Sequence, residues 1–168
     1  MTPVPGGRAG DLVQLLNLAP HPEGGWFREF FRSATRAPQA DGRGERQALT
    51  SIDFLLAAGE RSAWHRVASD EAWHLVEGGP LRLWLVPPTL DRIDLLTLAP
   101  TDAAGSRPRA VVPAHWWQAA EPAPGAAYAL CGATVGPGFD FADFAFGRDD
   151  AAFVRALPAL HANTTRLL

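Results

Sequence analysis

The chain has 168 residues, a formal net charge of −3 and 47% hydrophobic residues, as expected for one soluble globular domain with a sizeable core. This charge gives no basic footprint for nucleic acid. All fifteen basic residues are Arg, which excludes lysine Schiff-base chemistry, and the single Cys131 excludes an intramolecular disulfide framework. The N-terminus lacks a signal pattern and no apolar run could span a membrane, so we expect a cytoplasmic protein without membrane contacts.

The chain reads as a series of short strands with helices only at its ends. Residues 1–8 are rich in Pro and Gly and are expected to be loose. Asp11 predicts the start of a short helix, and a rigid Pro and Gly turn over residues 20–25 follows it. Residues 34–47 are polar and Gly-rich, which predicts an exposed loop. The predicted strands, in chain order, are 26–32, 48–56, 62–67, 71–77, 81–86, 93–98, 109–112, 115–119 and 126–135.

This pattern predicts an all-β sandwich or barrel in a single domain spanning residues 1–168. No helical periodicity of useful length occurs between residues 48 and 135, which argues against an α/β fold. A helical tail is expected over residues 147–168. Within it, Asp149 and Asp150 predict a helix start, and Pro158 predicts its end.

The stretch from Gly59 to Gly79 is where we expect the chemistry. Two alternating runs, 62–67 and 71–77, flank a short turn and predict a β-hairpin. Because side chains alternate along a strand, His65 lies on the same face as Ala63 and Val67, and Glu71 on the same face as Trp73 and Leu75. A His and a carboxylate on paired strands can converge on a metal ion or a polar small molecule.

The spacing Gly59-x5-His65-x-Val67-x3-Glu71-x6-Gly78 resembles the first motif of the cupin family, with Val67 where that motif has its second His. The stretch 111–118 (VVPAHWWQ) resembles the second cupin motif, with Gln118 at its His position. Four further segments resemble one largely uncharacterised cupin subfamily: HPEGGWFRE at 21–29, SAWHR at 62–66, SDEAWH at 69–74 and PGFDFADF at 137–144.

The resemblance implies a double-stranded β-helix, the cupin jelly-roll barrel, with short terminal helices. It also implies a homodimer, in which we expect an N-terminal strand to join the partner's sheet. It says little about the reaction, because cupins include isomerases, epimerases, dioxygenases, decarboxylases and binding proteins without catalytic activity.

The resemblance leaves a divalent metal open. Its ligands would be His65, Glu71 and Gln118, because Val67 cannot bind a metal and an amide oxygen is a weak ligand. We expect no metal and no other cofactor. The preferred interpretation is a cavity in which these three side chains bind an organic ligand directly.

We therefore predict a small-molecule cupin, of isomerase or epimerase type, acting on a sugar-like or carbonyl substrate. His65 would be the acid or base and Glu71 its orienting partner, raising the pKa of the imidazole. Arg28, Trp73 and Gln118 are the expected substrate contacts, through an anion-binding fork, a stacking ring and an amide. A ligand-binding cupin without catalysis and a metal-dependent cupin enzyme are the alternatives. His21, between two prolines, is not expected to be catalytic.

Overall fold

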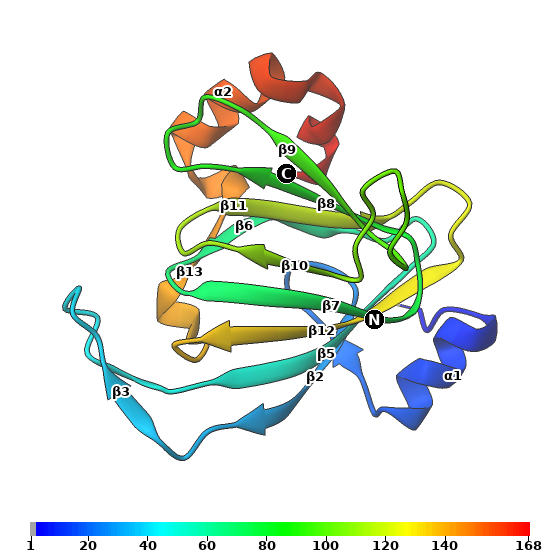
Figure 1. Ribbon diagram of the computed structural model, residues 1–168, viewed down its shortest axis with the longest axis horizontal. Helices are drawn as coiled ribbons and strands as arrows, with labels where there is room; N and C mark the ends of the chain where they lie inside the picture. The colour runs from blue at the N-terminus through cyan, green and yellow to red at the C-terminus, as the bar shows by residue number, and fades with distance from the viewer. Residues whose placement is uncertain (1–2) are drawn as a thin grey trace.

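The computed structural model describes residues 3–168 as two antiparallel sheets packed face to face, which confirms the predicted all-β cupin barrel (Figure 1). The first sheet has the strand order β1-β2-β5-β12-β7-β10, and the second has the order β13-β6-β11-β8-β9. The strands of the first sheet are β1 (Ala19–Pro20), β2 (Trp26–Arg32), β5 (Thr50–Ala57), β7 (Asp70–Gly78), β10 (Arg109–Val112) and β12 (Tyr128–Gly136). Those of the second are β6 (Ser62–Val67), β8 (Leu81–Val86), β9 (Asp94–Leu98), β11 (Trp117–Pro122) and β13 (Phe144–Phe146).

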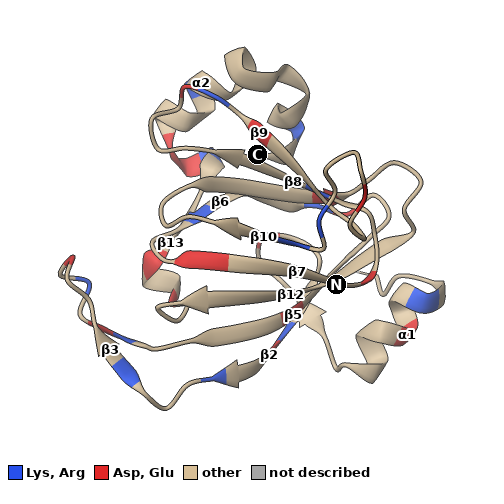
Figure 2. Ribbon diagram, in the orientation of Figure 1, with Lys and Arg blue, Asp and Glu red and all other residues tan. Residues whose placement is uncertain are grey.

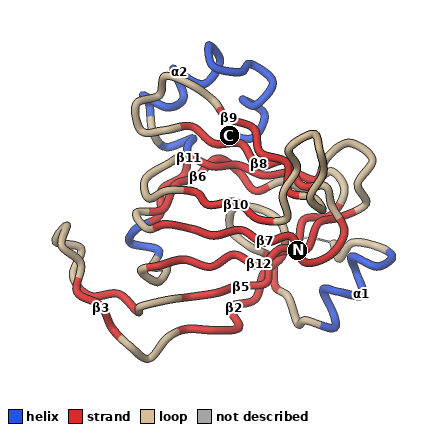
Figure 3. Tube along the Cα trace, in the orientation of Figure 1, coloured by secondary structure: helices blue, strands red, loops and turns tan. Residues whose placement is uncertain are grey.

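Helices cover the outside of the barrel, and within residues 3–168 none runs between the sheets (Figure 3). Helix α1 (Gly7–Leu15) packs Leu12 and Val13 on Trp26 and Leu55, against the outer face of the first sheet. Helix α2 (Ala151–His161) packs Phe153 against the outer face of the second sheet. Three short 3-10 helices complete the set: η1 (Phe141–Asp143), η2 (Gly147–Asp149) and η3 (Ala162–Leu167).

Alternation along the strands divides the barrel interior into a filled end and an open end. On β5, Phe54 and Leu56 belong to the packed core between the sheets, whereas Thr50 and Ile52 line a cavity. On β6, Trp64 faces outward beneath α2 and His65 faces inward. The period of two therefore places polar groups inside without interrupting the outer apolar layer.

The predicted hairpin of β6 and β7 is wrong. β6 pairs with β11 and β13, whereas β7 pairs with β10 and β12, so the two strands lie in opposite sheets. Residues Ala68 and Ser69 form a corner that carries the chain from one sheet to the other. His65 and Glu71 consequently face each other across the barrel interior instead of lying side by side.

Three local predictions also need correction. Helix α1 begins at Gly7 with Gly6 as its N-cap, so Asp11 is not the cap and the loose segment predicted for residues 1–8 extends too far; residues 1–2 lie outside the described part. Pro158 lies inside α2 and does not end it, although it has no amide to donate; the neighbouring Leu157 is buried. The expected loop at 34–47 contains a two-stranded hairpin of β3 (Arg36–Pro38) and β4 (Glu45–Gln47).

Candidate functional site

A cavity of about 290 Å³ opens at the end of the barrel where β7 begins and β12 ends. This volume lies near the small end of the range for ligand sites in proteins. The aliphatic part of its wall consists of Ile52, Val67, Ala133 and Val135. Four phenylalanine rings, two histidines, four acidic side chains, one arginine and Thr50 line the remainder. The cavity therefore combines apolar walls with a few titratable groups.

His65 projects from β6 into the cavity with only 2% of its surface exposed. Its Nδ1 lies 2.8 Å from the carbonyl oxygen of Ala63, and its Nε2 lies 3.2 Å from Oε2 of Glu23. Because a carbonyl oxygen can only accept a hydrogen bond, Nδ1 carries a proton. Nε2 of the neutral ring is then the basic nitrogen, and it faces a carboxyl group.

Glu23 reaches this position through the turn between β1 and β2. Its Oε1 accepts a hydrogen bond of 2.8 Å from the hydroxyl of Ser62, and its backbone carbonyl accepts one of 2.8 Å from the amide of Ala63. The turn requires glycine at position 24, where φ is +112° and a Cβ would lie 2.1 Å from the carbonyl oxygen of Arg61. The HPEGG segment, residues 21–25, therefore contains the carboxyl group of Glu23 that contacts His65.

Burial controls the protonation of this group of side chains. It raises the pKa of Glu23 to about 8, although the hydrogen bond from Ser62 acts in the opposite direction. Burial lowers the pKa of His65, and it lowers that of His21 to about 4. Contrary to the sequence prediction, the pKa of His65 is therefore not raised. Near neutral pH these shifts favour a protonated Glu23 and a neutral His65, so the 3.2 Å contact between Oε2 and Nε2 involves no charge separation.

Glu71 occupies the facing wall, at the start of β7, within the acidic segment coloured red in Figure 2. Its Oε2 accepts a hydrogen bond of 2.6 Å from Nε2 of Gln118, whose Oε1 accepts one of 3.0 Å from Nε1 of Trp73. Burial raises the pKa of Glu71 to about 7. Its Oε1 has no hydrogen-bond partner among the described residues, and it retains access to the cavity.

The predicted site residues occupy different layers of this structure. His65 and Glu71 line the cavity. Trp73 and Gln118 are buried behind Glu71, where they orient its carboxyl group, and they do not line the cavity. Arg28 is exposed on the opposite face of β2, beside Asp53 of β5. The carboxyl group in contact with His65 is that of Glu23, not Glu71.

Arg32 lines the cavity instead of Arg28. The register of β2 against β5 shifts between Glu29 and Phe31, so this irregularity changes the face on which the following residues lie. Glu29 and Arg32 then meet at the rim, with Arg32 nitrogens 2.6 and 2.7 Å from the carboxylate oxygens of Glu29. Strict alternation puts Arg28 and Arg32 on one face and Glu29 on the other, so it could not predict the contact between Glu29 and Arg32.

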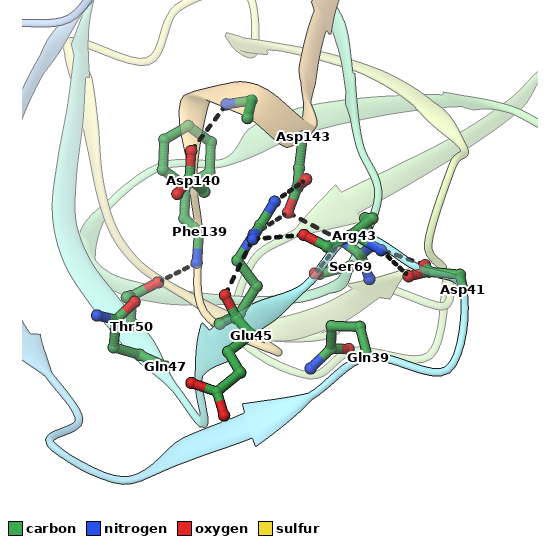
Figure 4. Close-up of polar contacts among 12 residues, drawn as sticks. Gln39, Asp41, Arg43, Glu45, Gln47, Thr50, Ser69, Phe139, Asp140 and Asp143 are labelled. Carbon is green, nitrogen blue, oxygen red and sulfur yellow. Dashed lines mark hydrogen bonds and ion pairs between the residues drawn. The ribbon is translucent and has the colours of Figure 1, made fainter.

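A buried carboxylate fixes the rim of the cavity. Asp143 accepts hydrogen bonds of 2.8 Å from Nε and Nη2 of Arg46, and one of 2.9 Å from Nη1 of Arg43 (Figure 4). These bonds, those of Arg46 foremost, hold the pKa of Asp143 below its usual range. They tie the β3–β4 hairpin, through Arg43 of its loop and Arg46 of β4, to residues 139–144, which carry three of the cavity's aromatic rings.

The residues at the cupin metal-ligand positions do not form a metal site. Val67 offers no donor atom, and both polar atoms of the Gln118 side chain are engaged, one by Glu71 and one by Trp73. Within residues 3–168, no group of three or more His, Cys, Asp or Glu side chains is placed to hold a metal ion. The set His65, Glu71 and Gln118 therefore does not fit a divalent cation.

The family model described as "Cupin superfamily (DUF985)" matches residues 10–147 of the sequence. The chain belongs to the cupin superfamily. The comparison with curated proteins found no significant match. Among residues 3–168, no helix has the length and apolar character needed to cross a membrane.

Two solved structures resemble this cupin over nearly its whole length. A protein from Shewanella oneidensis is 31% identical, with a TM-score of 0.78 and coverage of 96% of this chain and 95% of that one. A hypothetical protein from Leishmania major is 28% identical, with the same TM-score and coverage of 96% of both chains. Bacillus subtilis oxalate decarboxylase shares only the fold, at 13% identity and a TM-score of 0.53 over 76% of this chain and 29% of that one.

Proposed function

We propose that this cupin is an acid–base enzyme of isomerase or epimerase type, acting on a small carbonyl compound bound in the barrel cavity. The supporting observation is the placement of two proton-handling groups on facing walls. Glu71 presents an open carboxyl oxygen on one wall, and on the other Oε2 of Glu23, whose pKa is raised to about 8, lies 3.2 Å from Nε2 of His65. A substrate between them would have a base and an acid on separate sides.

In the proposed reaction the ionised carboxylate of Glu71 removes a proton from the carbon next to the substrate carbonyl. The electrons of the C–H bond move into the new C=C bond of an enol, and the Glu23–His65 pair donates its proton to the carbonyl oxygen. Glu71 then gives its proton to the neighbouring carbon and the Glu23–His65 pair takes back a hydroxyl proton of the enol, which completes an isomerisation; protonation of the original carbon on its opposite face would complete an epimerisation. A pKa of about 7 keeps Glu71 able to gain and lose a proton near neutral pH.

Hydrogen–deuterium exchange into substrate tests this proposal. Small ketones, aldoses and amino ketones would be incubated with the protein in D2O and followed by proton NMR. We expect enzyme-dependent loss of the signal from the carbon next to the carbonyl, abolished by Glu71→Gln. Glu45→Gln, at an exposed ion pair with Arg36 outside the cavity, is the matched control. Exchange that persists in Glu71→Gln would refute the assignment.

The alternative is a ligand-binding cupin without turnover. The closed network of Asp143 with Arg43 and Arg46 favours it, because a tightly held rim suits retention of a ligand. Such a protein would show ligand-dependent increases in Tm and no exchange with any compound that binds.

We also propose that the protein is a homodimer formed along β2. Within the described chain, β1 covers only Trp26 and Phe27 on this edge, and Phe30 and Phe31 are 53% and 46% exposed. An unpaired strand edge with exposed aromatic rings favours pairing with a second copy. Light scattering should give the mass of a dimer, and Phe31→Glu should reduce it to that of a monomer. A cytoplasmic location and a single domain over residues 1–168 stay predictions from the sequence.

A further inference from the structure

We infer that the ligand of this cavity is a small organic cation, a protonated amine or a quaternary ammonium compound, with its positive group beside the carbon that faces Glu71, within the field of that carboxylate. The inference concerns the same site as the proposed function and specifies its substrate class. It rests on three features of the cavity: its charge balance, its aromatic mouth and the open oxygen of Glu71.

The charge balance of the wall is negative. Its acidic groups are Glu29, Asp140, Glu71, which is ionised above about pH 7, and Glu23, which is ionised only above about pH 8; its arginine is Arg32. Two hydrogen bonds commit Arg32 to Glu29, and its Nη atoms also reach the carbonyl oxygen of Phe139 at 3.3 and 3.4 Å. The lining therefore has no unpaired guanidinium, and it has no lysine because the chain contains none. A phosphate or carboxylate would meet acidic groups without a compensating cation.

The mouth of the cavity is aromatic. The ring of Phe139 lies edge-on to those of Phe141 and Phe144, with centroids 5.0 and 6.2 Å away. The centroids of Phe141 and Phe144 are also 6.2 Å apart, and Phe27 lines the cavity as a fourth ring. Clustered aromatic rings attract cations through their negative faces, and such cages bind quaternary ammonium groups in other proteins.

The open oxygen of Glu71 gives the cation a specific partner. The Glu71 side chain is more than nine-tenths buried and Gln118 fixes its Oε2, so Oε1 is oriented and lacks a protein partner among residues 3–168. A neutral ligand can form one hydrogen bond with this oxygen, as acceptor or as donor, without any gain from charge, and an anion is repelled by the ionised form. A cation gains from the ionised form, and the low polarity of the surrounding wall strengthens that attraction.

The inference predicts a specific pH dependence of cation binding. Affinity should increase as the pH rises through about 7, because Glu71 then loses its proton. Glu23 acts in the same direction as the pH rises through about 8, whereas burial keeps His21 and His65 neutral over this range. The other charged groups facing the cavity are Glu29, Arg32 and Asp140, of which the first two are paired with each other.

Three compounds of matched shape test the inference: choline, its neutral carbon analogue 3,3-dimethylbutan-1-ol, and the anion 3,3-dimethylbutanoate. Calorimetry at pH 8 with the full chain should show binding of choline, about tenfold or more weaker binding of the neutral analogue, and none of the anion. Benzyltrimethylammonium would serve as a second, larger cation. Failure of both cations to bind, or equal binding of the neutral or anionic analogue, would overturn the inference.

Two variants locate the cation within the cavity. Glu71→Gln should abolish the preference for choline over its neutral analogue, whereas Glu45→Gln should retain it. Phe141→Ala, at a ring that is 59% exposed and therefore tolerant of substitution, should weaken choline binding about 2- to 5-fold. An unchanged choline affinity in Phe141→Ala, together with an unchanged preference in Glu71→Gln, would show that the cation binds elsewhere and that the inference is wrong.

The binding test and the exchange experiment can refute their two proposals independently. Cation selectivity without deuterium exchange would refute the proposed catalysis and retain the ligand class. Exchange into neutral carbonyl compounds without cation selectivity would retain the catalysis and refute the ligand class.

Discussion

Oε2 of Glu23 lies 3.2 Å from Nε2 of His65, and this contact joins the turn before β2 to the middle of β6. The other carboxyl oxygen of Glu23 is held by Ser62, and the other ring nitrogen of His65 by the carbonyl of Ala63. Each group therefore has one atom fixed by the scaffold and one atom facing its partner. This arrangement determines which atoms can exchange a proton with a ligand.

Replacement of Glu23 by Gln should slow the proposed proton exchange about 100-fold or more, because an amide can occupy the same space but cannot deliver the proton. The measurement is the rate of deuterium incorporation into a substrate found with the wild-type protein. Ser62→Ala removes only the hydrogen bond to Oε1 and should reduce the rate less. A Glu23→Gln rate within twofold of wild type would mean that the pair has no role in proton transfer.

Protein stability should fall as the pH rises from about 6.5 to 8. The pKa values of Glu23 and Glu71 are raised to about 8 and about 7 from an ordinary 4.5, so the folded state retains protons that the unfolded chain has released. Their contribution is fully present below pH 4.5 and is lost as the pH rises through the folded values. Below pH 6.5 the trend is opposed, because the unfolded chain protonates His21 and His65, whose folded pKa values are lowered.

Urea unfolding at half-unit pH intervals measures this dependence. The double variant Glu23→Gln, Glu71→Gln should give a flatter profile between pH 6.5 and 8. A wild-type profile that rises across this interval would contradict the assignment of two buried, protonated carboxyl groups.

Replacement of Asp143 by Ala should release the β3–β4 hairpin. The Asp143 side chain is only 3% exposed and binds two arginines, so its loss leaves Arg46 without its carboxylate partner and Arg43 with Asp41 alone. We expect a decrease of roughly 1–3 kcal/mol in the free energy of unfolding. Trypsin should cleave after Arg43 and Arg46 faster than in wild type, as followed by mass spectrometry. Asp149→Ala, at an exposed position nearby, should leave the cleavage rate unchanged.

The double variant Val67→His, Gln118→His should create a metal site that the natural residues do not provide. It supplies three histidines and Glu71, which is the ligand set that cupin metal centres use, at positions on facing sheets. Calorimetry should detect binding of Mn²⁺ or Zn²⁺ to the double variant, and only weak binding to the wild-type protein. Tight stoichiometric binding to wild type that is lost in His65→Ala would show that the natural residues form a site after all.

The strand pattern predicted an all-β sandwich or barrel, and the resemblance to the cupin family implied that His65 and Glu71 lie inside it. Neither predicted their relation to each other. The runs at 62–67 and 71–77 fit a hairpin locally, and only the competition among strands for partners sends them to opposite sheets. Strand pairing is decided by the whole chain, so local turn chemistry could not reveal it.

Glu23 and Arg32 were missed for two different physical reasons. Glu23 lies in a turn, where no period indicates direction, although the adjacent glycines signalled an unusual backbone. Arg32 follows a register shift, which reverses the alternation from which its direction was inferred. Unbroken alternation puts Arg28 and Arg32 on the same face, so it cannot show which of the two lines the cavity.

Because β6 and β7 lie in separate sheets, the distance between His65 and Glu71 depends on how far apart the sheets are held at the packed end of the barrel. Side chains such as Leu83 and Phe54 act as spacers that hold the sheets apart, although neither touches the cavity. A larger or smaller spacer would change the separation of the acid from the base without altering either group. Relatives with identical reactive residues could thus accommodate ligands of different thickness through exchanges in the distant interior.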